Sequence, residues 1–117
     1  MKAAVFYKSY SQLSLEERDV PVPKANEALV KVAACGVCHT DLHFIDHGTK
    51  PRKEPPLILG HEITGIVEDV GGEVTGFSGG ERVLIAVVIP CNKCEWCERG
   101  RTNICRNRVI PGNSFDG

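Results

Sequence analysis

Four cysteines within sixteen residues constrain this chain more than any other feature of its sequence. Cys91, Cys94, Cys97 and Cys105 follow the spacing C-x2-C-x2-C-x7-C in the segment PCNKCEWCERGRTNIC. This spacing lets four thiolates converge on one tetrahedral zinc ion, at Zn–S distances of about 2.3 Å. Because four sulfurs leave no coordination position open, the spacing predicts a structural zinc site rather than a catalytic one.

Two alternatives stay open for these cysteines. They could be buried or paired thiols, although three cysteines at successive i+3 positions with a fourth close by rarely arise by chance. An iron–sulfur cluster is the stronger rival, because bacterial ferredoxins also begin with C-x2-C-x2-C. In those proteins the fourth cysteine follows after three residues and precedes a proline. Here Cys105 follows after seven residues and precedes Arg106.

The size and charge of the chain favour one folded domain without nucleic-acid or membrane partners. It has 117 residues, of which 42% are hydrophobic, and a formal net charge of -1. Its longest apolar run, Val83–Ile89, has only seven residues, and Lys8 comes before a signal-peptide core could form. We therefore expect a cytoplasmic protein, whose six cysteines serve as metal ligands or buried thiols rather than disulfides.

Short apolar runs with period-two alternation predict a mainly β fold. The runs expected to form strands span residues 1–7, 12–20, 27–34, 63–70 and 81–88. One short helix is expected from about Thr40 to Asp46, with Leu42, Phe44 and Ile45 packing inward before Gly48. The segment PRKEPP should be a loop, and no G-x-G-x-x-G motif follows any expected strand, so these residues contain no dinucleotide-binding domain.

A second group of potential metal ligands lies upstream of the four cysteines. Cys38 precedes the expected helix, and His61 and Glu62 follow the proline-rich loop. A cysteine and a histidine from distant segments are typical of a catalytic zinc, which keeps one coordination position open, but two ligands are not enough.

The histidines of the expected helix leave their role open. His39 and His43 are four residues apart and share a helix face, so they could form an H-x3-H metal pair or remain solvated. The sequence favours neither metal role for them, and His47 lies in the same segment. Cys35 is expected to be a small buried residue at a strand end.

Three strings and the cysteine segment carry a resemblance to a known family. In order and spacing, ACGVCHTDLH, LILGHEITGIVEDVG and GFSGGERVL resemble the N-terminal part of the zinc-dependent alcohol dehydrogenases of the medium-chain dehydrogenase/reductase family. The resemblance covers essentially the whole chain. It implies a GroES-like, antiparallel, barrel-like β domain at residues 1–117, with a short helix, a projecting zinc lobe at about 90–106 and no Rossmann domain in this chain.

The resemblance also implies roles for residues around a catalytic zinc. Cys38 and His61 match two of its ligands, and Glu62 matches an acidic neighbour that can exchange with those ligands. Asp41 matches a carboxylate that accepts a hydrogen bond from the ligand imidazole and fixes its tautomer. Such a zinc acts as a Lewis acid in moving a hydride between an alcohol and NAD or NADP.

Three residues of the expected helix match positions that contact substrate or cofactor in the family. Thr40 matches the hydroxyl that hydrogen-bonds the substrate oxygen, and His43 matches the histidine that passes its proton to solvent through the cofactor ribose. His39 matches a basic position near the cofactor pyrophosphate. The implied substrate is a small alcohol, aldehyde or ketone, and the full-length enzyme is expected to be a homo-oligomer.

Two parts of the family pattern have no counterpart among these 117 residues. The third protein ligand of the catalytic zinc lies well beyond the cysteine lobe in the family, and the Rossmann domain follows it. We therefore expect the chain to be a truncated catalytic domain that is inactive alone. The alternative is a non-catalytic zinc-binding β domain with a structural or interaction role.

Overall fold

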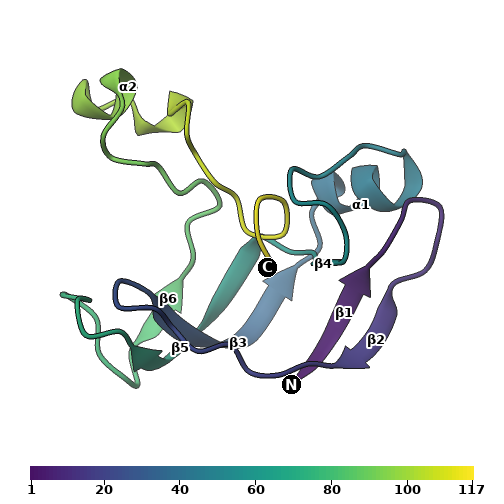
Figure 1. The fold of residues 1–117 in the computed structure, drawn as a ribbon, viewed down its shortest axis with the longest axis horizontal. Coiled ribbons are helices and arrows are strands. Elements are labelled where there is room, and N and C mark those ends of the chain that lie inside the picture. The colour runs from purple at the N-terminus through teal and green to yellow at the C-terminus, as the bar shows by residue number, and fades with distance from the viewer.

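Six strands pair into two antiparallel sheets in the computed structural model, which describes residues 1–117 (Figure 1). In the first sheet, β1 (Lys2–Phe6) lies between β2 (Ser14–Glu17) and β4 (Leu57–Ile58). In the second sheet, β5 lies between the other two strands; the strands are β3 (Ala28–Gly36), β5 (Glu62–Val70) and β6 (Arg82–Leu84). The mainly β fold is confirmed, but the two sheets remain separate and do not close into a barrel.

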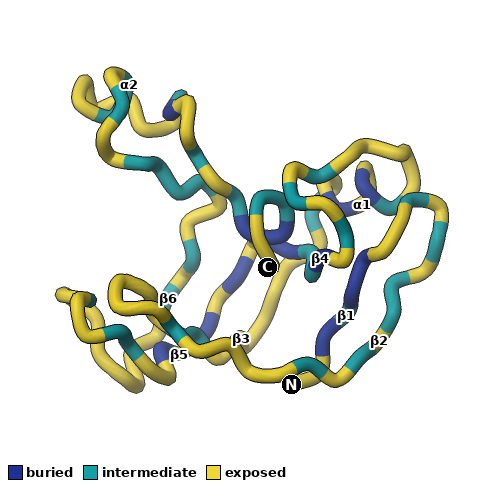
Figure 2. Tube along the Cα trace, in the orientation of Figure 1, coloured by how far each residue is buried: buried dark blue, intermediate teal, exposed yellow.

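The alternation seen in the sequence decides which side chains form the core. Along β5, Ile63 and Val67 are buried while Thr64 and Ile66 face solvent, as a period of two requires. The core is small, since only 14 of the 117 residues are buried. Figure 2 shows this buried part on β1, β5 and the segments next to them. Its apolar members are Ala3, Val5, Phe6, Phe44, Leu57, Ile63, Val67 and Cys105.

The expected helix is present as α1 (His39–Asp46), and its start is held by a side chain. The backbone N–H of Cys38 donates to Asp41 Oδ2 at 3.0 Å, which satisfies one of the free donors at a helix N-terminus. Phe44 is buried three residues after Asp41, on the same face. Leu42 is 37% exposed, contrary to expectation, because successive residues of a helix point about 100° apart and Asp41 already faces inward.

The expected burial of Cys35 and the expected length of the strand at residues 81–88 were both wrong. Cys35 lies at the end of β3 as expected, but it is exposed, because most of β3 is uncovered. The apolar run at residues 81–88 forms a strand only at Arg82–Leu84, and the short strand β4 was not anticipated.

The four-cysteine segment projects from the body of the molecule (Figure 1). It contains a one-turn helix α2 (Glu95–Glu98) and a 3-10 helix η1 (Thr102–Ile104). At its base, Ile89 and Val109 exchange two backbone hydrogen bonds of 3.0 Å. None of the helices in the structure is long and apolar enough to cross a membrane.

After this lobe the chain returns to the body beside β4 (Figure 1). The backbone N–H of Ile58 donates to Asp116 Oδ1 at 2.9 Å, and Gly117 N–H donates to the Ile58 carbonyl at 2.9 Å. Lys53 N–H donates to the Asn113 carbonyl at 2.8 Å. Residues 113–117 thereby hold the loop that leads into His61.

Candidate metal centres

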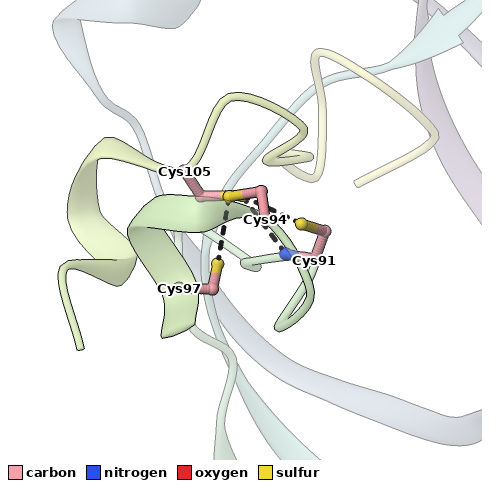
Figure 3. Close-up of side chains that lie close together, drawn as sticks. All are labelled: Cys91, Cys94, Cys97 and Cys105. Atoms are coloured by element: carbon pink, nitrogen blue, oxygen red, sulfur yellow. Dashed lines mark hydrogen bonds between the residues drawn. The ribbon is translucent and has the colours of Figure 1, made fainter. Parts of the chain in front are cut away.

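The four cysteines of the lobe turn their sulfurs toward one point (Figure 3). The Sγ of Cys94 lies 3.6 Å from that of Cys97 and 3.8 Å from that of Cys105, which lies 3.5 Å from that of Cys91. Around a tetrahedral zinc with Zn–S bonds of about 2.3 Å, the sulfurs are about 3.8 Å apart. The cluster therefore has the size and donor set of a closed four-thiolate zinc site.

The same distances decide against the alternatives for these cysteines. All six cysteines are free thiols, and the sulfurs lie well beyond the S–S bond length of about 2.05 Å. The ligand sulfurs of a multinuclear iron–sulfur cluster bind different irons, so they spread around the whole cluster. Here all four sulfurs lie within 4.8 Å of one another, which suits a single ion.

Local backbone structure brings the lobe cysteines together. Cys94 is the N-cap of α2, and Cys97 lies in the same helix. Asn92 adopts a φ of 55° in the turn between the first two cysteines, and the N–H of Cys91 donates to Cys105 Sγ at 3.3 Å. Outside the cluster, the guanidinium groups of Arg99 and Arg101 each lie 5.6 Å from the centre of the Trp96 ring, and Arg106 pairs with Glu95.

Backbone hydrogen bonds prepare part of this cluster for negatively charged sulfur. Several hydrogen-bond donors lower the pKa of Cys94 to about 6, and the backbone N–H of Cys97 has the largest effect. The N–H of Lys93 likewise lowers the pKa of Cys91. Burial, together with the neighbouring thiols, raises the pKa of Cys97 to about 11. Donors aimed at sulfur favour the thiolate, which is the form that binds metal.

The second cluster contains Cys38, His61 and Glu62, whose ligand atoms lie within 4.8 Å of one another. Strand register produces this meeting, because β3 and β5 pair with Gly36 opposite Glu62. The residues that follow Gly36 and precede Glu62 are therefore neighbours in space, although they are far apart in sequence. A thiolate, an imidazole and a carboxylate are a suitable donor set for zinc, and Glu62 is exposed rather than enclosed.

Asp41 lies behind His61, and both side chains are almost fully buried. Asp41 Oδ1 is 3.6 Å from His61 Nδ1, and this oxygen has no hydrogen-bond partner. A buried carboxylate oxygen needs a donor, and the ring N–H of His61 is the group that faces it. An imidazole protonated at Nδ1 leaves Nε2 free to bind a metal.

Two glycines that adjoin this cluster in sequence have no room for a side chain, and the sequence analysis did not single them out. Gly60 has a φ of +110°, and a Cβ there would lie 2.6 Å from Cys35 Sγ. Because Gly36 has no side chain, the Glu62 carboxylate can lie close against its backbone. The sequence did offer a signal for both glycines, because Gly60 directly precedes His61 and Gly36 lies two residues before Cys38.

The remaining predicted residues occupy the exposed face of α1. Thr40 Oγ1 lies 3.7 Å from Cys38 Sγ, and His43 follows three residues later on the same side of the helix. His39 is exposed at the first helical position and stacks edge-on against His43 with a ring-centroid distance of 4.8 Å. The structure thus places Thr40 beside Cys38, and His39 and His43 against each other on the exposed side of α1.

Comparisons with known proteins agree with this architecture. The model of the alcohol dehydrogenase GroES-like domain matches residues 24–117. The class-3 alcohol dehydrogenase of Caenorhabditis elegans is 44% identical over 115 residues, which cover 97% of this chain and 30% of that relative.

Solved structures of dehydrogenases also match the fold of this chain. A cobalt- and zinc-bound thermostable alcohol dehydrogenase from Pyrobaculum aerophilum matches with a TM-score of 0.90 and 32% identity, over 100% of this chain and 36% of that one. Galactitol-1-phosphate dehydrogenase from Escherichia coli matches with a TM-score of 0.90 and 29% identity, over 100% of this chain and 33% of that one. The chain spans about a third of the length of these relatives. The chain belongs to the alcohol dehydrogenase GroES-like domain family, within the zinc-type medium-chain alcohol dehydrogenases.

Proposed function

We propose that this chain is the zinc-binding, substrate-side portion of an NAD(P)-dependent alcohol dehydrogenase. The observation that carries the proposal is the meeting of Cys38, His61 and Glu62 within 4.8 Å. Cys38 and His61 would hold a catalytic zinc, and the exposed Glu62 would exchange with its ligands. The four lobe cysteines would hold a structural zinc. When bound at the first site, zinc supplies Lewis-acid assistance to the oxidation of an alcohol.

The proposed roles of the chain's own residues follow from their positions. Asp41 holds the His61 ring in one tautomer through its Nδ1, which directs Nε2 to the metal. Thr40 stands beside Cys38 and would hydrogen-bond the substrate oxygen. His43, one helical turn further and exposed, would pass the proton released from that oxygen to solvent through the cofactor ribose.

Other parts of the proposal extend beyond these residues. His39, at the exposed N-terminal end of α1, would occupy the basic position near a cofactor pyrophosphate. Because the 117 residues contain no dinucleotide-binding motif, NAD or NADP would bind elsewhere in the enzyme, and the chain alone is expected to be inactive. We further propose a small alcohol, aldehyde or ketone as substrate, a cytoplasmic location, a homo-oligomer, and no nucleic-acid or membrane partner.

Native mass spectrometry of the chain and two variants tests the proposed metal sites. We expect two zinc ions in the unchanged chain, loss of one in His61→Ala and loss of the other in Cys94→Ser. A His61→Ala chain that keeps both ions would remove His61 from the metal site. A single ion that only Cys94→Ser removes would leave the non-catalytic zinc domain as the better description.

Activity is tested in a protein that carries these residues together with a cofactor domain. There, His61→Ala should abolish alcohol oxidation while the lobe zinc remains bound. Near-normal turnover by that variant would contradict the proposed catalytic centre even if the metal content agreed.

A further inference from the structure

Three histidines form a continuous stack along the exposed face of α1. His39, His43 and His47 follow one another at intervals of four residues. Their ring centroids are 4.8 Å apart for the first pair and 5.3 Å apart for the second, with interplanar angles of 85° and 71°. All three side chains are exposed, and His47 takes no part in the proposed function.

Such a stack offers metal ligands that are already close together. Neutral imidazole is a good ligand for zinc, copper and nickel, and residues at i and i+4 are neighbours on a helix surface. Exposed rings can rotate about their side-chain bonds until two nitrogens face the same ion. His39 and His47 are two turns apart, about 12 Å along the axis, so one ion can be held by only two of the three histidines.

Electrostatics favours the C-terminal pair over the N-terminal one. The C-terminal end of a helix carries partial negative charge and attracts cations, while the N-terminal end repels them. His47 is the C-cap of α1, and the exposed carboxylate of Asp46 lies three residues after His43. His39 is the first helical residue and adjoins Cys38, whose proposed zinc would repel a second cation.

We propose that His43 and His47 chelate a divalent transition-metal ion on the surface of α1, separate from the two cysteine-containing centres. The ion would occupy one ring nitrogen of each histidine and leave the remaining positions to water. While bound, it would withdraw a nitrogen of His43 from proton transfer. The site itself depends only on the helix geometry, so its failure would leave the proposed function untouched.

Calorimetric titration with Ni²⁺ tests this site in the zinc-loaded chain, at about pH 7.5, where an ordinary imidazole is neutral. We expect His47→Gln to weaken Ni²⁺ binding at least about tenfold, because the second ligand of a chelate acts at high effective concentration. His39→Gln is the matched control, since it changes an equally exposed histidine of the same stack, and it should alter the affinity less than about twofold.

Paramagnetic broadening of the histidine ring signals by Ni²⁺ locates the ion. The signals of His43 and His47 should broaden before those of His39. Earlier broadening of His39, or a loss of affinity in His39→Gln but not in His47→Gln, would overturn the proposal in favour of the N-terminal pair. Equal Ni²⁺ affinity in both variants and in the unchanged chain would show that no chelate forms. Release of zinc on adding Ni²⁺, without any change in the histidine signals, would lead to the same conclusion.

Discussion

Among single residues, Cys94 is the one on which the proposed structural zinc depends most. Cys94→Ser should lower the midpoint of the lobe's thermal transition by at least about 5 °C, because a closed zinc site contributes its binding free energy to folding. Trp96 is the chain's single tryptophan and lies in α2, so its fluorescence reports on the lobe. Cys35→Ser is the matched control, since this exposed cysteine lies outside both clusters. An unchanged midpoint with one zinc fewer would mean that the ion does not support the lobe.

Asp41 allows the orientation of His61 to be tested separately from folding. Asp41→Asn keeps an oxygen that can accept the Cys38 N–H bond, so the start of α1 should persist. It removes the carboxylate facing His61 Nδ1, and we expect zinc affinity at that centre to fall about 10- to 100-fold. Competition with a chromophoric chelator measures the change. Asp46→Asn, on the exposed side of the same helix, should leave the affinity as it is.

At the level of elements, the turn into β5 depends on Gly60. Gly80→Ala serves as the reference, because Gly80 also has a positive φ, +91°, but open space around it. Its replacement should cost about 1–2 kcal/mol from backbone conformation alone. Gly60→Ala should cost clearly more, since its Cβ would also meet Cys35 Sγ at 2.6 Å. Urea unfolding of both variants makes the comparison, and equal losses would show that the close contact is relieved without cost.

The β1–β2 pair carries a pH-dependent interaction. A hydrogen bond from Tyr7, with help from Ser14 and Arg18, lowers the pKa of Glu16 below its ordinary value. A lowered carboxyl pKa stabilises the fold above the ordinary glutamate pKa, and the effect disappears as the pH falls through the folded-state value. Glu16→Gln should therefore lower the thermal midpoint at pH 7, and the difference from the unchanged chain should shrink as the pH falls below the ordinary glutamate pKa of about 4.3. Glu17→Gln, its neighbour on the opposite face of β2, provides the comparison at each pH.

At the scale of the whole molecule, the lobe and the two sheets are distinct parts. The lobe is connected to the body through the Ile89–Val109 bridge and the returning C-terminal segment. A strong chelator should therefore abolish hydrogen-exchange protection in residues 91–105 while protection in β1 and β5 persists. Simultaneous loss of protection in both parts would mean that the lobe zinc holds the entire fold together.

Much of this architecture was predictable because it depends on short-range patterns. The cysteine spacing predicted a cluster, and the structure confirms that the four sulfurs converge. Period-two alternation located β1, β3 and β5, and the helix was found within one residue. Short elements such as α2 and β4 were missed, because four-residue and two-residue segments have too little pattern of their own.

The amino-acid sequence alone determined which residues have metal-binding chemistry, because thiol spacing and side-chain type are local properties. The meeting of Cys38 with His61 was expected only from a resemblance, since the spacing between these residues says nothing about their distance. The tertiary structure decided it through the register of β3 and β5, which sets Gly36 opposite Glu62. It also decided that Cys35 and Leu42 are exposed, because burial depends on which elements cover a strand or helix face, and no local pattern specifies that.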